Sequence, residues 1–282
     1  MLSANYPAIT KTELAKRLGV SRALLYYRHK QPAIDEEVKR QIESVLADHP
    51  AYGHKRIALA LKLNKKRILR VMKKFKIKPY RRRKSPAKPD DQGKPAVSYP
   101  NVSLMMCAIV VDYIWVSDFT YIKFKTYFIY LATIMDQHSR EVVGWNVSRY
   151  HNAELVLGAL EHSLSNPDHT RPRYLHSDQG SEYQSQHYIQ TAANLQIKIS
   201  MSGKSSPWQN GYQESFYSQF KVDLGDPNRF EELGELIEAI NQTIIYYNTK
   251  RIHTTLKMTP TQFRKKSRRR IYSDNSPSQL GT

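Results

Sequence analysis

Three consecutive segments rich in β-branched and aromatic residues, 109–124, 127–135 and 141–148, constrain the fold of this chain more than any other feature. Short polar turns separate them, a pattern typical of antiparallel strands that follow one another along the chain. Farther on, helical periodicity alternates with short strand-like runs. Three strands followed by alternating helices and strands predict a mixed α/β sheet with helices covering both of its faces.

The elements expected after the third strand are placed by their periodicity and by the turn residues between them. Each predicted helix carries apolar residues three or four positions apart, and each predicted strand is a short apolar run. We expect helices near 152–165, 185–195, 207–224 and 230–248, and strands near 174–176 and 197–201.

Basic residues are concentrated at the two ends of the chain. Residues 1–100 carry a formal net charge of +17 and residues 264–282 one of +5, whereas residues 101–263 carry −3. Cations that served only solubility would not be separated in this way. The distribution predicts a nucleic-acid-binding region and a basic tail attached to a globular body with a different task.

Residues 1–32 have the pattern of a helix-turn-helix segment. Thr10 is a suitable N-cap for a first amphipathic helix, and Gly19 ends that helix. Ser21 then begins a second short helix, which would carry Arg22 and Arg28 towards DNA. An ordinary helical hairpin without DNA contacts is the alternative interpretation.

Residues 33–80 predict a basic helical DNA-binding domain, with helices near 36–47, 55–63 and 65–75. The last of these helices has almost no acidic residues among its cations, so phosphate groups are the expected partners. A basic, Pro-rich linker follows at 81–101. The cations expected to bind DNA in these two regions are Arg56, Lys65, Lys66, Arg67, Arg70, Arg81, Arg82 and Arg83.

Two aspartates occupy positions where a carboxylate needs a partner. Asp118 interrupts an apolar strand and Asp178 ends another, and burial there is costly unless the charge is paired, solvated or bound to a cation. Glu214 lies in a predicted helix, four residues after Asn210 and seven before Lys221, so these three share one helical face. The three carboxylates would form an oxygen-rich pocket suited to Mg²⁺, and two such ions can promote in-line displacement at phosphorus.

Each of these acids also has a plainer interpretation. A single aspartate at a strand end is more commonly satisfied by backbone amides in a turn, and Glu214 alone would be an exposed helix residue. Asp112, six residues before Asp118, would share its strand face and is the alternative first carboxylate. We expect Asp136 and Glu182 at the surface or in turns.

Seven short motifs extend over nearly the whole chain: LGVSR (18–22), YGHKRI (52–57), WVSDFTY (115–121), SREVVGW (139–145), HSDQGSEY (176–183), NGYQESF (210–216) and YNTKRIHTTL (247–256). Thirty-five residues separate Asp178 from Glu214. The motifs and this spacing resemble the D,D(35)E signature of DDE transposases and retroviral integrases. The set as a whole is similar to the second-frame transposases of the insertion sequence three family.

The resemblance implies a ribonuclease H-like fold at 102–263, with Asp118, Asp178 and Glu214 as a catalytic triad that binds two Mg²⁺ ions, for which Mn²⁺ can substitute. It implies cleavage at the ends of a mobile element and transfer of the freed 3′-hydroxyl to target DNA, both double-stranded. A homo-oligomer on DNA and a first-frame partner protein are implied as well. The remaining candidates for DNA contact are Asn210, Lys221, Arg251 and His253.

Other observations bear on location and on the competing functions. The longest apolar runs have eight residues, far short of the roughly 18 to 20 that cross a membrane. Cys107 is the single cysteine, which fits a reducing cytoplasm and provides no set of zinc ligands. The resemblance implies a bacterial protein that acts at the nucleoid. The alternatives are a DNA-binding regulator or element-end binding protein with a non-catalytic ribonuclease H-like domain, and a nuclease without strand transfer.

Overall fold

The computed structural model describes residues 10–26, 31–81, 99–105, 108–203 and 211–274. Its centre is a five-stranded sheet built from β1 (Ile114–Phe124), β2 (Tyr127–Asp136), β3 (Val142–Ser148), β4 (Tyr174–Ser177) and β5 (Lys198–Met201). The strand order is β3-β2-β1-β4-β5. The β3-β2-β1 pairs are antiparallel and the β1-β4-β5 pairs are parallel. The predicted mixed sheet is confirmed.

The first strand begins five residues later than predicted, and the reason is the backbone at Asp112. Asp112 has a φ of +60°, in the left-handed region that a strand cannot contain. Its amide donates to the Asp136 carboxylate at 3.0 Å. Asp112 therefore lies in a turn before β1 and does not share a strand face with Asp118, so this alternative first carboxylate is wrong.

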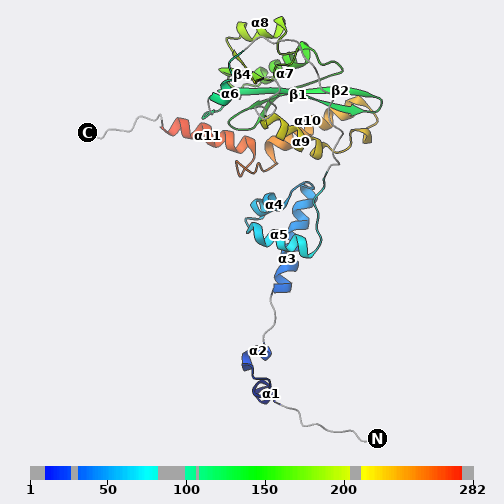
Figure 1. The fold of residues 1–282 in the computed structure, drawn as a ribbon, viewed down its shortest axis with the longest axis vertical. Coiled ribbons are helices and arrows are strands. Elements are labelled where there is room, and N and C mark those ends of the chain that lie inside the picture. The colour runs from blue at the N-terminus through cyan, green and yellow to red at the C-terminus, as the bar shows by residue number, and fades with distance from the viewer. Residues whose placement is uncertain (1–9, 27–30, 82–98, 106–107, 204–210, 275–282) are drawn as a thin grey trace, which may run out of the picture.

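Helices cover both faces of the sheet, as predicted (Figure 1). α7 (Ala153–Ser165) and α8 (Gln186–Asn194) pack on one face, and α9 (Gly211–Leu224) and α10 (Leu233–Thr249) on the other. The alternation of a strand serves both layers: in β1, Trp115 packs with the α7 and α8 layer, and Ile122 and Phe124 with α9 and α10. Two short elements complete the core, α6 (Val102–Met105) and the 3-10 helix η2 (Pro227–Arg229).

Two short helices near the N-terminus agree with the predicted helix-turn-helix pattern. α1 (Lys11–Leu18) is capped by Thr10, whose hydroxyl accepts from the Glu13 amide at 3.3 Å. Gly19 ends it with a φ of +64°. α2 (Arg22–Tyr26) follows directly. Across the described residues, no helix is long and apolar enough to cross a membrane.

The predicted basic domain is a three-helix unit of α3 (Gln31–Asp48), α4 (His54–Leu61) and α5 (Lys65–Lys74). It has a core of its own, in which Ile42, Ile57 and Ile68 are fully buried. It also contacts the body built around the sheet. The Ile252 amide donates to the Tyr52 hydroxyl at 2.7 Å, and Arg56 Nε donates to the Ile252 carbonyl at 3.0 Å.

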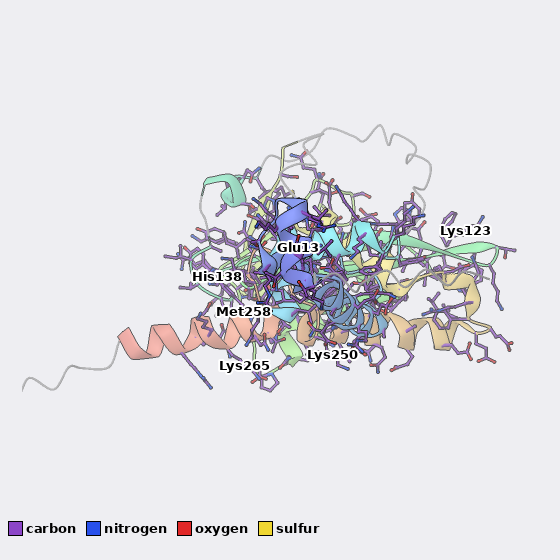
Figure 2. The ribbon with its side chains drawn as sticks, turned by 90° about the horizontal axis from the view of Figure 1, so that it is seen from below. Glu13, Lys123, His138, Lys250, Met258 and Lys265 are labelled. Atoms are coloured by element: carbon purple, nitrogen blue, oxygen red, sulfur yellow. The ribbon has the colours of Figure 1, made fainter. Side chains whose placement is uncertain are left out.

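The segment predicted as a basic tail is in large part a helix that packs on the core, α11 (Pro260–Asp274). Arg264 is only 4% exposed and pairs with the carboxylates of Asp112 and Glu141. Arg268 also reaches Asp112, at 3.3 Å. These arginines hold the helix to the core. Lys265 projects from α11 (Figure 2), and among the residues of the helix up to 269 the exposed cations are Lys265, Lys266 and Arg269.

Candidate active site

Asp118 and Asp178 lie on neighbouring parallel strands at the same level of the sheet. In the β1–β4 ladder Val116 is paired with His176. Two residues farther along each chain, the same register brings Asp118 opposite Asp178, which directly follows the end of β4 at Ser177. Parallel strands have their carboxyl ends at one edge of the sheet. The fold therefore unites two carboxylates that are far apart in sequence.

Both aspartates also bond to nearby backbone amides. Asp118 Oδ1 accepts from the Phe119 amide at 2.8 Å, and Asp178 Oδ1 accepts from the Gly180 amide at 3.0 Å. A Cβ at Gly180 would come within 3.1 Å of Asp178 Oδ1 and 2.9 Å of Glu182 Oε2. A side chain at this position would therefore displace the Glu182 carboxylate and crowd that of Asp178.

Glu182 lies in a turn, one of the two positions expected for it, but it is buried. It is 6% exposed and pairs with His151 through Nδ1 and Oε1 at 2.7 Å. Asp136 is likewise buried, where it accepts from the backbone amides of Asp112 and Ser139. Burial raises the pKa of Asp136 against the hydrogen bonds from Ser139. Both acids stabilise turns beside the sheet, a role that requires their tertiary partners.

Helix α9 is fastened across β1 by two buried polar side chains. Gln213 donates to the carbonyls of Val116, at 2.6 Å, and Thr133, at 3.2 Å. The Tyr217 hydroxyl donates to the Asp118 carbonyl at 2.6 Å. Glu214 follows Gln213 in the first turn of α9 and is exposed. The helix thus carries Glu214 to the part of β1 that holds Asp118.

Lys221 lies on the same flank of α9 as Glu214, two turns further on. Its Nζ donates to the Thr120 hydroxyl at 2.6 Å and lies 5.0 Å from the centre of the Tyr121 ring. These contacts place the cation along β1 just beyond Asp118. A phosphate near the aspartates would therefore meet a positive charge on this side.

The charges of the two aspartates affect the pKa values of two buried tyrosines, Tyr183 and Tyr217. Burial raises the pKa of Tyr183 well above its ordinary value, and the charges of Asp118 and Asp178 raise it further. The pKa of Tyr217 is raised by burial and by the same two carboxylates. Both phenols therefore keep their protons, and Tyr183 shares a hydrogen bond with Ser117 at 3.1 Å.

The donor chemistry of the aspartate pair fits a divalent metal, because Mg²⁺ prefers carboxylate oxygens. Within the parts of the chain that the structure describes, no three His, Cys, Asp or Glu side chains are grouped closely enough to hold a metal ion. The structure places Asp118 and Asp178 side by side at the sheet, and Glu214 lies on the neighbouring helix α9.

The cations predicted to bind DNA are spread over several surfaces. Arg22 on α2 and Arg81 after α5 are exposed, as are three consecutive residues of α5. Arg56, Arg251 and His253 are gathered around one cavity. The three exposed α5 residues are Lys65, Lys66 and Arg67, and the predicted residues outside the described part are Arg28, Arg82, Arg83 and Asn210.

Arg70 has a partner that sequence reasoning overlooked. Its guanidinium binds the buried Asp35 of α3 in a fork, with Nη1–Oδ2 at 2.8 Å and Nη2–Oδ1 at 2.6 Å. Lys74 adds a third contact, at 2.9 Å. Hydrogen bonds from Arg70 and then Lys74 hold the pKa of Asp35 well below its usual range. The prediction of phosphate partners rested on the near absence of acids within α5, whereas the partner Asp35 comes from α3.

His176 and Trp115 are core residues. His176 is fully buried and shares a 2.8 Å hydrogen bond with Ser200 through Nδ1. Burial lowers its pKa to about 4, so the ring is neutral. The Trp115 indole donates to Asp112 Oδ1 at 3.0 Å.

Comparisons with known proteins agree with this architecture. Residues 111–207 and 195–260 match two family models, each described as an integrase core domain. The fold also resembles a chain of the simian T-cell lymphotropic virus intasome in complex with the PP2A regulatory subunit B56 gamma, with a TM-score of 0.51 and 16% identity over 86% of this chain and 76% of that one. The body of the protein is thus an integrase-type core of ribonuclease H-like fold.

Relatives of nearly the same length identify the family. The chain is 31% identical, over 255 residues, to the transposase for insertion sequence element IS904 of Lactococcus lactis, covering 84% of this chain and 96% of the relative. It is 28% identical, over 271 residues, to the putative transposase InsK for insertion sequence element IS150 of Escherichia coli, covering 89% and 92%. The chain belongs to the insertion sequence three family of DDE transposases, which are polynucleotidyl transferases.

Proposed function

We propose that Asp118, Asp178 and Glu214 form the metal-binding triad with which this transposase cleaves at the ends of a mobile element and joins the freed 3′-hydroxyl to target DNA. The observation that carries the proposal is the register of β1 and β4, which places Asp118, within β1, level with Asp178, directly after the end of β4. Helix α9 crosses β1 at the same place and bears the glutamate.

Some residues of the site would hold the metal, and others position helix α9. Asp118 and Asp178 would hold it from the sheet, and Glu214 would complete the site from α9. Two bound divalent cations, Mg²⁺ or Mn²⁺, would supply activation of the attacking oxygen and stabilisation of the departing one. Gln213 and Tyr217 fix the position of α9 on β1, and so determine where Glu214 lies relative to the aspartates.

DNA is the substrate, and Lys221 is the cation best placed to bind its scissile phosphate. It lies on the triad side of α9 and already bonds to Thr120, two residues after Asp118. A first-frame partner protein and a homo-oligomer that holds two element ends would complete the reacting complex. Action on chromosomal DNA would place the protein at the bacterial nucleoid.

The test is a strand-transfer assay with labelled element ends, with Mg²⁺ and with EDTA. We expect Asp178→Asn and Glu214→Gln to abolish cleavage and joining while both variants still bind DNA. Glu161→Gln is the matched control, because Glu161 is an exposed glutamate of α7 on the opposite face of the sheet. It should react like the wild type.

Each outcome has a defined meaning. Joined products from Asp178→Asn or Glu214→Gln would refute the triad. Cleaved ends without joined strands from the wild type would indicate a nuclease. Binding without any reaction, even after addition of the first-frame partner, would indicate a DNA-binding regulator with a non-catalytic core.

A further inference from the structure

A cavity of about 510 Å³ lies on the flank of α9 that faces away from Glu214 and Lys221. On α9 it is lined by Tyr212, Ser215 and Gln219, whereas Glu214 and Lys221 project from the other side of the helix. The β2–β3 turn contributes Arg140 to the lining. The remaining basic residues of the lining are Arg56, Arg251 and the neutral His253, and none of its described residues is acidic.

The arginines of this cavity are held in place by the fold. Arg251 is 2% exposed and donates to the Gln219 side-chain oxygen and the Asp223 carboxylate, both at 2.6 Å. Arg56 of α4 donates to the Ile252 carbonyl at 3.0 Å and approaches the same Gln219 oxygen at 3.4 Å. The cavity therefore joins the α3–α5 domain to the integrase core.

Arg140 is set against an aromatic ring. Its guanidinium carbon lies 3.5 Å from the centre of the Tyr212 ring. Its backbone has a φ of +64°, a conformation uncommon for arginine, and its amide donates to the Asp136 carbonyl at 2.9 Å. A stacked guanidinium keeps its edge available for an in-plane partner. Among the described residues, the buried Arg140 Nη1 and His253 Nδ1 have no hydrogen-bond partner.

The positive charges crowd one another in a poorly solvated place. Burial lowers the pKa of Arg56 to about 10, with a further contribution from Arg251. The pKa of His253 falls to about 4 through burial and then through the charges of Arg140, Arg56 and Arg251. Asp223 is the carboxylate that pairs with Arg251. An anion in the cavity would offset this repulsion.

We propose that this cavity, the Arg140 pocket, binds a backbone phosphate of DNA on the side of α9 opposite the catalytic triad. Guanidinium groups match phosphate oxygens in a planar fork, and the hydroxyls of Thr254 and Thr255 at the exposed rim add donors. The inference rests on the proposed function in that DNA is the polyanion. Since Arg56 comes from α4, a phosphate here would fix the basic domain on the core while DNA is bound.

The test is the affinity of the full chain for a fluorescent DNA duplex, measured in EDTA over a series of salt concentrations. We expect Arg140→Gln to bind about tenfold to a hundredfold more weakly at moderate salt, as for a lost charged hydrogen bond. The slope of log K against log salt should fall by about 0.9 for one lost phosphate contact. Arg149→Gln is the matched control, because Arg149 is also stacked on a tyrosine, 4.5 Å from the Tyr127 ring centre.

A second variant guards against misfolding. Thr255→Glu places a carboxylate at the exposed rim without altering a core contact, and it should weaken DNA binding with an unchanged melting temperature. Affinity and slope equal to the wild type in both variants would overturn the proposal. Variants that lose binding of inorganic phosphate but keep the wild-type affinity for DNA would also overturn it, because the cavity would then be a site for a free anion.

The proposal of the Arg140 pocket and the proposal of the triad can be refuted independently of each other. Asp178→Asn should keep the full effect of Arg140→Gln on binding in EDTA, because the pocket does not use the metal. If Asp178→Asn still joins strands while Arg140→Gln weakens binding, the triad is wrong and the pocket stands. If Asp178→Asn abolishes strand joining while Arg140→Gln binds DNA like the wild type, the pocket is wrong and the triad stands.

Discussion

Gln213→Leu should both destabilise the core and impair the reaction, although Gln213 itself does not contact the substrate. Its buried amide makes three hydrogen bonds: two donated to the carbonyls of Val116 and Thr133, and one accepted from the Thr133 hydroxyl at 3.1 Å. Leucine fills a similar volume and forms none of them. At about 0.5–1.5 kcal/mol for each net hydrogen bond, the expected loss is about 2–4 kcal/mol of unfolding free energy.

For a body of this size, a loss of that magnitude lowers Tm by roughly 5–15 °C. Because Glu214 follows Gln213 on the helix, we expect strand joining to fall at least about tenfold, equivalent to about 1.4 kcal/mol in the barrier. Urea unfolding followed by tryptophan fluorescence and the strand-transfer assay, both at a temperature where the variant is folded, measure the two effects.

Gln242→Leu on α10 is the matched control, since Gln242 is exposed and bonds only to Glu238 among the contacts described, at 2.7 Å. It should change stability by less than about 0.5 kcal/mol and leave joining intact. A Gln213→Leu protein with the stability of this control would refute the view that the amide fastens α9. A destabilised protein that still joins strands at the normal rate would refute its influence on Glu214.

Three further predictions concern charge and protonation. The pKa of buried His176, about 4, lies below that of the same residue in the unfolded chain, so the unfolded state binds more protons between pH 4 and 6.5. The free energy of unfolding should therefore fall on acidification through this window, by up to about 1.4 kcal/mol per pH unit. His176→Gln should flatten the dependence of Tm on pH. Arg264→Leu should cost about 3–5 kcal/mol in urea unfolding, because it leaves the buried carboxylate of Asp112 without its principal partner; a smaller loss than from Lys265→Leu would contradict this. Lys66→Gln should reduce the salt dependence of DNA binding at unchanged Tm, whereas Arg70→Gln should lower Tm by several degrees, and equal effects on Tm would argue against the Asp35 cluster.

Much of the fold follows from local signals. Thr10 and Gly19 mark the ends of α1, and the capping bond and the positive φ are both present. The run of β-branched and aromatic residues at 127–135 yields β2 within one residue, because such residues favour a strand buried on both faces. Such signals fail where the backbone turns for a tertiary reason, as at Asp112, which has a strand-like context and a left-handed φ.

Only part of the candidate site was predicted, because local signals report some of its residues and not others. The spacing of Asp178 and Glu214 and the motifs around them can be read from the sequence, and the fold then brings Asp118 and Asp178 together. The residues that fasten α9, Gln213 and Tyr217, gave no such signal. Their partners are backbone carbonyls of β1 and β2, about 80 to 100 positions away, and a carbonyl has no sequence identity.

By itself, the sequence determined the order of helices and strands, the basic front and the three acids that the family motif contains, because periodicity, capping and motif spacing are local properties. Only the tertiary structure decided which charges are neutralised. Arg70 is matched by Asp35 and Arg264 by Asp112, whereas Arg140 and His253 meet other cations across a cavity. Electrostatic interactions depend on distance and burial in space, and the fold alone sets both.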